Sequence, residues 1–427
     1  MPRRLRSGYC IGAAGALFCL LASAATAQAP SDDPSIDNTI DAAEAEGVGP
    51  RRQLVRWNEY EGPYFTARLG GGFLVDAVAY EQDAESREQG ELSSDTGLRD
   101  FRFLLKGKLK FSPRLSYSIG YMYDGNQEVW RFRQTGIMVD VPEGLGNVFI
   151  GRQKEGFSTN KIMVGYSGWT QERSTASDSF IPILADGVKW TGTVPSGKFV
   201  YNVGWFRDRL SENESFDKND QQVIARAVWL PFTGKEPGKL LHLAVEARYG
   251  ESDNGTLQFR SKPESFLAQR YVLDTGKIPA THSNMLGLES YFRRGPMTLG
   301  MEWFFNQVYS PETGDPLFHG GEVLFAYLLT GEVRRYNAKG AFFEGISPAR
   351  PVFAGGPGAW ELVLRYSYTS LDSASVHGGT FWRLTPMVNW HMSDNVRLEL
   401  SYGYGEERSE GLRGGTQFFQ ARLQLQL

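Results

Sequence analysis

Long runs in which apolar and polar residues alternate dominate the chain from Tyr64 onward. The most regular run reaches the last residue, where Phe419, Ala421, Leu423, Leu425 and Leu427 alternate with Gln420, Arg422, Gln424 and Gln426. Similar runs occupy residues 101–111, 360–368 and 396–404. Because successive side chains of a strand point to opposite faces, each run predicts a β-strand with one apolar and one polar face.

Strand length and aromatic placement distinguish the two all-β architectures that use such strands. A soluble sandwich uses strands of about five or six residues, whereas a strand that crosses a bilayer needs about 9–11. The runs have the longer length, and aromatic residues stand at the ends of their apolar faces, as in the girdles of membrane barrels. The pattern predicts an all-β fold, a transmembrane antiparallel β-barrel of about 16 strands.

Short and long connections alternate between these strands. We predict tight turns at 112–113, 143–146, 195–197, 295–296 and 393–395, and long polar connections at 82–97, 154–186, 210–220, 251–282, 309–319, 371–377 and 406–413. Outer-membrane barrels have short periplasmic turns and long extracellular loops, so this order gives the direction of the barrel. An even number of strands brings both ends of the barrel to the periplasmic side.

One basic connection, 332–358, is long although strand parity places it among the short turns. It predicts either a periplasmic loop folded into the pore or a missed hairpin around Phe342 and Phe343.

The N-terminal region does not share the strand pattern. Arg3, Arg4 and Arg6 precede an apolar stretch that ends near Ala25, and small residues follow it, which is the pattern of a cleaved secretory signal. The stretch is shorter than the roughly 20 residues that a spanning helix needs. We expect a signal peptide at 1–27, a flexible periplasmic leader at 28–60 and the barrel domain at 61–427.

Composition argues against several other classes of protein. Both cysteines, Cys10 and Cys19, lie in the expected signal, so the mature chain has no thiol and no disulfide. The whole chain has a net charge of -4, and removal of the signal arginines makes it more acidic, which excludes nucleic-acid binding through bulk charge.

Candidate catalytic and metal-ligating residues are absent from the sequence pattern. The histidines are scattered without metal-ligand spacing and are interpreted as solvated or rim residues: His242, His282, His319, His377 and His391. No nucleophile is matched with a base. We expect no catalytic site, no metal and no cofactor.

Basic residues cluster on predicted polar strand faces. Arg102, Lys106 and Lys108 share one face, and Arg131 and Arg133 share another, opposite Trp130 and Phe132. Fixed cations along a narrow pore favour the passage of anions. Lys108 lies near the predicted turn at 112–113, and there an alternative is that Lys108 and Lys110 extend to lipid headgroups at the rim.

The long connection at 154–186 and the strand end before it add further candidate pore-lining cations, Arg152, Lys154, Lys161 and Arg173. A wide barrel leaves an open channel unless a loop folds inward, so these side chains are expected at a constriction. Glu155 and Glu172 stand beside them and offset part of their charge.

The segment GRQKEGFSTNKIMVGYSGWTQERS at 151–174 resembles the third loop of the phosphate-selective porin O and P family, and the ending FFQARLQLQL agrees. The resemblance implies a homotrimeric, sixteen-stranded outer-membrane porin with inward-folded loops whose arginines and lysines guide anions, phosphate in particular. It also implies that the 332–358 connection is an inward-folded periplasmic turn.

The leading hypothesis is therefore a porin of the Gram-negative outer membrane, and not an enzyme. It passes small anions such as phosphate by passive diffusion, with outer-membrane lipids and two further copies of itself as partners. The alternatives are a general non-selective porin, an outer-membrane barrel enzyme and a secreted β-rich binding protein. Conductance separates a porin from the last two.

Overall fold

The computed structural model of the chain describes residues 58–427 apart from 126–127, 142–144, 164, 210–218 and 234–237. The predicted signal peptide at 1–27 and most of the predicted leader at 28–60 lie outside the described residues, as do parts of the connections predicted at 143–146 and 210–220. The first described strand, β1 (Glu59–Glu61), pairs with β2, two residues before the expected start of the barrel domain.

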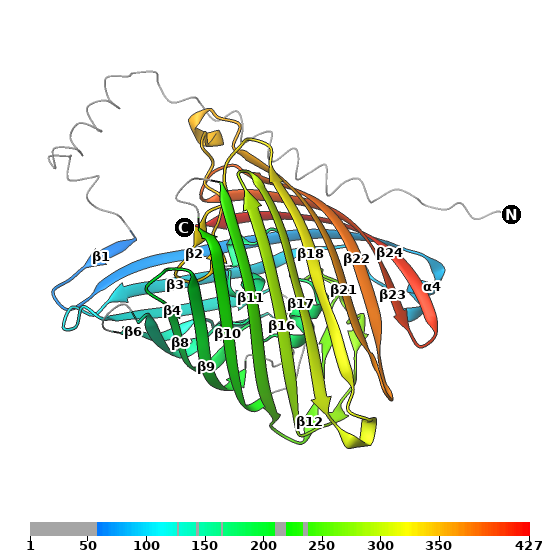
Figure 1. Cartoon of the computed structure of the whole chain (residues 1–427). Coiled ribbons are helices and arrows are strands. Elements are labelled where there is room, and N and C mark those ends of the chain that lie inside the picture. Colours follow the sequence, from blue (N-terminus) through cyan, green and yellow to red (C-terminus); the bar gives the residue numbers. More distant parts are fainter. Residues whose placement is uncertain (1–57, 126–127, 142–144, 164, 210–218, 234–237) are drawn as a thin grey trace. The chain divides into compact units, whose positions relative to one another are not determined.

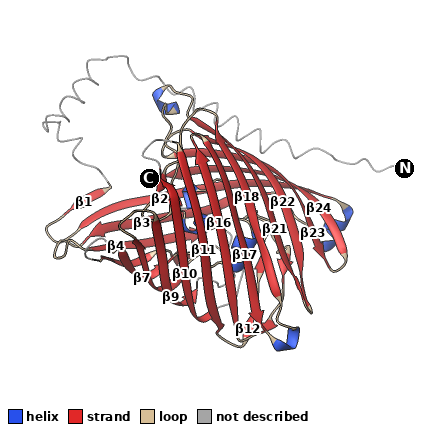
Figure 2. Cartoon of the chain, in the orientation of Figure 1, coloured by secondary structure: helices blue, strands red, loops and turns tan. Residues whose placement is uncertain are grey.

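Sixteen strand positions close into one antiparallel barrel, as predicted (Figures 1 and 2). The last strand pairs with the first from Gly72↔Gln426 to Gln82↔Thr416, and β5 and β6 share one position beside β4. The barrel strands are β2 (Thr66–Gln82), β3 (Asp95–Lys108), β4 (Leu115–Asp124), β5 (Val129–Phe132), β6 (Thr135–Asp140), β7 (Asn147–Gln153), β8 (Ala185–Thr193), β9 (Phe199–Arg209), β10 (Asn219–Thr233), β11 (Lys239–Ser252), β16 (His282–Arg294), β17 (Met297–Tyr309), β18 (Leu317–Leu328), β21 (Ala359–Ser373), β22 (Val376–His391), β23 (Val396–Ser409) and β24 (Leu412–Gln426).

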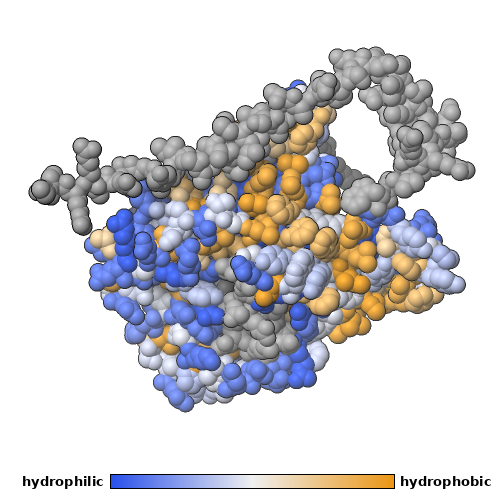
Figure 3. Space-filling model, turned by 180° about the vertical axis from the view of Figure 1, so that it is seen from behind, coloured by the Kyte–Doolittle hydropathy of each residue, from blue (hydrophilic) through white to orange (hydrophobic). Residues whose placement is uncertain are grey.

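The two faces of the barrel wall have the polarity expected of a membrane barrel. On β21, Leu362 and Leu364 are 39% and 43% exposed, whereas the intervening Arg365 is buried. Seen from behind, hydrophobic side chains gather in one zone of the outer surface, with hydrophilic side chains beside and below it (Figure 3). Apolar side chains therefore face outward and charged side chains face the lumen, the reverse of a soluble protein. Among the described helices, none is long and apolar enough to cross a membrane.

Connection lengths separate the two rims of the barrel. The tight turns at 112–113, 195–197, 295–296 and 393–395 lie at one rim, as predicted. The other rim carries the long connections. Two of those were predicted too long, because β21 to β22 and β23 to β24 are joined by only residues 374–375 and 410–411.

Three connections fold into the lumen and contain most of the remaining secondary structure. Residues 154–184, here called the constriction loop, contain α5 (Thr159–Ile162), η2 (Gly165–Ser167) and α6 (Thr175–Phe180). Residues 253–281 contain β12 (Thr256–Leu257), β13 (Arg260–Ser261), β14 (Leu273–Asp274) and β15 (Ile278–Pro279), and residues 329–358 contain β19 (Tyr336–Asn337), β20 (Phe342–Phe343) and η4 (Val352–Ala354). At the rim lie α4 (Ala84–Gln89) and η3 (Pro311–Thr313).

The 329–358 connection resolves the alternative that the sequence left open. It is an inward-folded loop that carries a two-residue hairpin, and no barrel strand was missed in it. Phe343 is fully buried with its ring 5.1 Å from that of Trp169, and Arg334 pairs with Glu361 of the wall at 2.9 Å. Buried apolar contact and a buried ion pair together hold this connection against the constriction loop.

Candidate functional site

The constriction loop leaves the wall at β7 and crosses the lumen. Gly156 has φ +91°, and an added Cβ would lie 2.9 Å from Cδ of Lys189, so only glycine fits at this bend. Farther along, wall side chains bind loop carbonyls: Asn389 donates to Trp169 at 2.8 Å, and Gln424 donates to Tyr166 at 3.1 Å. The loop is therefore attached to both sides of the barrel.

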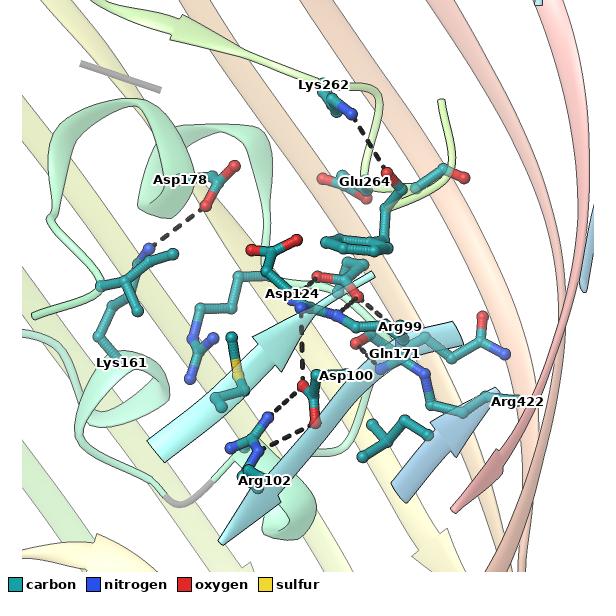
Figure 4. A pocket seen from close by; sticks show the side chains of 18 of the residues that line it. Arg99, Asp100, Arg102, Asp124, Lys161, Gln171, Asp178, Lys262, Glu264 and Arg422 are labelled. Carbon is teal, nitrogen blue, oxygen red and sulfur yellow. Dashed lines mark hydrogen bonds and ion pairs between the residues drawn. The ribbon is translucent and has the colours of Figure 1, made fainter. Parts of the chain in front are cut away.

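A cavity of about 140 Å³ lies between the constriction loop, the 253–281 connection and the wall formed by β2, β3, β4 and β24 (Figure 4). Its lining includes eight basic residues, Arg99, Arg102, Arg133, Lys154, Lys161, Arg173, Lys262 and Arg422, and five acidic residues, Asp100, Asp124, Glu172, Asp178 and Glu264. The formal charge of the lining is therefore positive by three.

Arg422 forms the centre of a buried ion network on one wall of the cavity. Its guanidinium contacts Asp76 at 2.6 Å and Glu172 at 2.5 Å, and Glu172 also receives Arg99 at 3.0 Å. Burial acts to raise the pKa of Glu172, but Arg99 and Arg422 outweigh it and lower that pKa below its usual range. Glu172 is therefore an ionised carboxylate whose charge is neutralised locally.

Arg102 is fixed between the wall and the loop. Its guanidinium donates two hydrogen bonds to Asp100, which is buried, and lies 4.3 Å from the centre of the Tyr166 ring. The ion pair and the cation–π contact orient the side chain and reduce its effective charge. Arg102 is thus a positioned cation with part of its field offset by Asp100.

Lys154 and Arg173 of the loop have a different environment, because backbone carbonyls accept their hydrogen bonds. Lys154 Nζ donates to the carbonyls of Ile162, at 3.2 Å, and Met163, and Arg173 Nε donates to the carbonyl of Asn160 at 3.2 Å. Burial, followed by the charge of Arg173 and three other neighbouring cations, lowers the pKa of Lys154 well below its usual range. An anion in the cavity would relieve this repulsion.

The lowered pKa of Lys154 predicts a pH dependence. A lysine with a lowered pKa loses its charge at a lower pH than an ordinary lysine, so the preference of the pore for anions should already fall as pH rises through the range below the ordinary lysine pKa of about 10.4. The Lys154→Arg variant should keep its preference over the same range, because arginine stays protonated. Reversal potentials at a series of pH values measure both. Equal pH profiles for the two proteins would show that Lys154 does not titrate in this range.

The structure brings together five of the nine predicted pore residues. Arg102, Arg133, Lys154, Lys161 and Arg173 all line the cavity. Lys161 is buried and lies 3.4 Å from Asp178. The loop cations and the wall cations therefore face one another across a single space.

The other predicted cations lie elsewhere. Lys106 and Lys108 share the lumen face of Arg102 but stand nearer the short-turn rim, with Lys106 about 13 Å from Arg102 along the strand. Arg131 pairs across the ladder with Met122 and so shares its lumen face, outside the cavity lining.

Arg152 corrects the prediction. It pairs with Asp186 at 2.6 Å and shares the face of Ile150, which is 51% exposed on the outside of the barrel. It therefore does not line the pore. Glu155 also faces away from the cavity, since its carboxylate lies 3.5 Å from Arg248 of the opposite wall.

Three further basic residues line the cavity and were not predicted from the sequence: Arg99, Lys262 and Arg422. The alternation of the last strand places Arg422 on the polar face, which was a usable signal. Arg99 lies at a bulge where the register of β2 and β3 shifts, so local period two does not predict its direction. Lys262 belongs to the 253–281 connection, whose inward course depends on long-range contacts such as that of Glu264 with Arg365.

The histidine interpretation holds for only part of the set. His242 is buried in the wall, 2.8 Å from Glu289, so it is neither a solvated nor a rim residue, whereas His391 is buried although it is the last residue of β22 and lies at the rim. The reason is that both stand on lumen faces covered by the inward-folded connections. Across the described residues, no three His, Cys, Asp or Glu side chains are arranged to hold a metal ion.

Comparisons with known proteins agree with the fold. A family model described as phosphate-selective porin O and P matches residues 68–427. An uncharacterized protein of Caulobacter vibrioides is 26% identical over 266 residues, covering 60% of this chain and 53% of that protein. Porin O of Pseudomonas aeruginosa is 24% identical over 213 residues, covering 43% and 47%. The chain thus spans about half the length of these curated relatives.

Solved outer-membrane barrels share the architecture at low identity. In vitro folded OmpT of Vibrio cholerae superimposes with a TM-score of 0.53 and 11% identity, over 86% of this chain and 99% of that one. An anion-selective porin from Comamonas acidovorans gives a TM-score of 0.50 and 13% identity, over 84% and 100%. At these identities the likeness shows the fold alone.

Proposed function

Because the chain belongs to the phosphate-selective porin O and P family of outer-membrane porins, we propose that it conducts small anions, phosphate among them, through the cavity beside the constriction loop. Solutes move by passive diffusion. The wall residues Arg99, Arg102 and Arg133 and the loop residues Lys154, Lys161 and Arg173 attract the anion and replace part of its hydration.

The local charge of the cavity carries this proposal. The whole chain is acidic, with a net charge of -4, but the cavity lining is positive by three. At physiological salt, surface charges are screened over about 8 Å, whereas charges in a narrow low-dielectric passage are screened less. The charges at the constriction therefore decide which ions pass.

A general porin is the second candidate, and the five carboxylates of the lining favour it. Asp100 and Glu172 each neutralise arginines directly. If such pairs cancel the field, the pore passes small solutes without regard to charge.

Competition between phosphate and chloride tests the proposal. Phosphate added to one side of a planar bilayer should reduce the chloride current through single channels, because phosphate occupies the cationic cavity for longer than chloride does. Lys154→Gln should weaken the reduction, and Lys277→Gln, at an exposed site outside the cavity lining, should leave it unchanged. A chloride current indifferent to phosphate would favour the general porin.

We further propose that the mature chain begins near Gln28 after signal cleavage and assembles as a homotrimer. Family membership supports both statements. Native mass measurement in mild detergent reports the mass of the mature chain and the number of copies together. A monomer would remove the trimer from the proposal and leave the pore unaffected.

A further inference from the structure

Four glutamates stand in a row on the lumen face of neighbouring strands, on the opposite wall from Arg422. The row consists of Glu246 of β11, Glu289 of β16, Glu302 of β17 and Glu322 of β18, strands that run side by side in Figure 1. Glu289 pairs directly with Glu302, and Glu302 pairs with Glu322. All four are buried. Like charges opposite one another are unfavourable, so the row requires partners.

The constriction loop supplies three consecutive backbone donors to the row. The N–H of Ser158 donates to Glu246 at 2.6 Å, and the N–H of Thr159 donates to Glu289 at 2.7 Å. The N–H of Asn160 donates to Glu302 at 2.8 Å. Each of three successive residues is thus bound by a different strand of the wall.

Side chains of the same three residues repeat the contact. Ser158 Oγ donates to Glu302, Thr159 Oγ1 donates to Glu289 at 2.8 Å, and Asn160 Nδ2 donates to Glu322. Each of these three residues therefore makes a side-chain hydrogen bond to the row in addition to the one that its backbone N–H makes. The row therefore accepts six hydrogen bonds from the loop.

The backbone of Ser158 is strained where it binds the glutamate row. Its φ is +66°, in a region that residues with a side chain seldom adopt. Ser158 is fully buried between the loop and the row. Such a conformation persists where surrounding contacts dictate it.

Cations and hydroxyls of the surrounding wall complete the charge balance of the row. Arg226 lies 2.9 Å from Glu246 and 2.7 Å from Glu289, and Arg365 lies 3.6 Å from Glu322. The hydroxyl of Tyr291 donates to Glu302 at 2.5 Å. Arg226 and Arg365 contact three of the four carboxylates, and His242 also lies 2.8 Å from Glu289, which leaves acceptor capacity for the loop.

The turn at residues 158–162 also binds two cations of the cavity. The carbonyl of Asn160 receives Arg173, and the carbonyl of Ile162 receives Lys154. The wall thus binds the N–H groups of this turn, and carbonyls of the same turn bind cavity cations. Displacement of residues 158–162 would displace Lys154 and Arg173.

We propose that the glutamate row is a positioning device that fixes the constriction loop, and through it the cations of the cavity, by binding the donors of residues 158–160. The row sets both the width of the constriction and the place of its positive charge. The part of this inference that concerns selectivity rests on the proposed anion conduction, whereas the part that concerns width does not.

Neutralising the row from the wall side tests the proposal. The Glu289→Gln/Glu302→Gln variant should raise single-channel conductance about twofold, because a released loop narrows the lumen less. It should also lower the anion preference. Loss of negative charge from the row without loop movement would instead raise the anion preference, so the sign of the change separates positioning from direct electrostatics.

Two further variants keep the test decisive. Glu399→Gln removes another buried lumen carboxylate, one that pairs with Arg397 of its own strand, and should change neither quantity. Ser158→Ala/Asn160→Leu removes two side-chain donors of the loop and leaves every glutamate in place. This variant should reproduce the higher conductance even if the wall variant does not fold. Normal conductance in the loop-side variant would overturn the proposal.

The readouts also separate the two proposals. If the parent pore shows no anion preference but the loop-side variant conducts more, the proposed anion conduction fails and the positioning role stands.

Discussion

Replacement of Arg133, Lys154 and Arg173 by glutamine in one variant should abolish the anion preference of the pore. The cavity lining has three more basic than acidic residues, and the variant removes three positive charges, so its constriction is formally neutral. Glutamine keeps a donor at each position and limits disturbance of the loop. Under a tenfold salt gradient, a pore that is ideally selective for monovalent ions has a reversal potential of ~59 mV. The reversal potential of the parent should lie on the anion side of zero, and that of the variant should be near zero.

A matched control separates local from overall charge. Lys198, Lys239 and Lys277 are exposed and lie outside the cavity lining, and their replacement by glutamine removes the same total charge. This variant should keep the reversal potential of the parent. Equal shifts in both variants would mean that overall charge, and not the constriction, governs selectivity.

Arg422→Met should destabilise the barrel by about 3–5 kcal/mol, because it leaves buried Asp76 without its arginine and removes one of the two arginines on Glu172. The unfolding midpoint in denaturant, followed by tryptophan fluorescence of the protein in lipid vesicles, reports the loss. The pair Arg422→Met with Asp76→Leu should recover much of it, since no unpaired carboxylate then remains beside the substituted residue.

Arg408→Gln is the control for this substitution. Arg408 also pairs with a carboxylate, Glu406, at 3.2 Å, but its side chain is 57% exposed. Exposed ion pairs contribute about 0–1 kcal/mol, so the unfolding midpoint should barely change. A similar loss in both variants would show that the Arg422 network is no more important than a surface pair.

The barrel could be predicted from the sequence because the pattern that specifies it is local. Period two in a run such as 419–427 identifies a strand and both of its faces without knowledge of the neighbours. Outer exposure of Leu362 and Leu364 and burial of Arg397 and Glu399 agree with that assignment. Closure and parity then followed from connection lengths.

The cavity could be predicted only in part because its geometry depends on long-range contacts. Arg102 was predicted from the alternation of its strand, and the loop cations were predicted from the unusual connection at 154–186. Arg152 was wrongly placed in the pore, since the length of strand β7 before the loop decides which way that side chain points. The glutamate row needs the pairing register of four strands, and backbone donors such as the N–H of Thr159 leave no signal in the sequence.

The anion preference of the constriction can be measured directly as the reversal potential of the unmodified protein under a potassium chloride gradient. One protein, one gradient and one voltage measurement report the sign of the charge at the constriction. We expect a potential on the chloride side of zero, although the chain as a whole is acidic. A potential at zero or on the potassium side would contradict it.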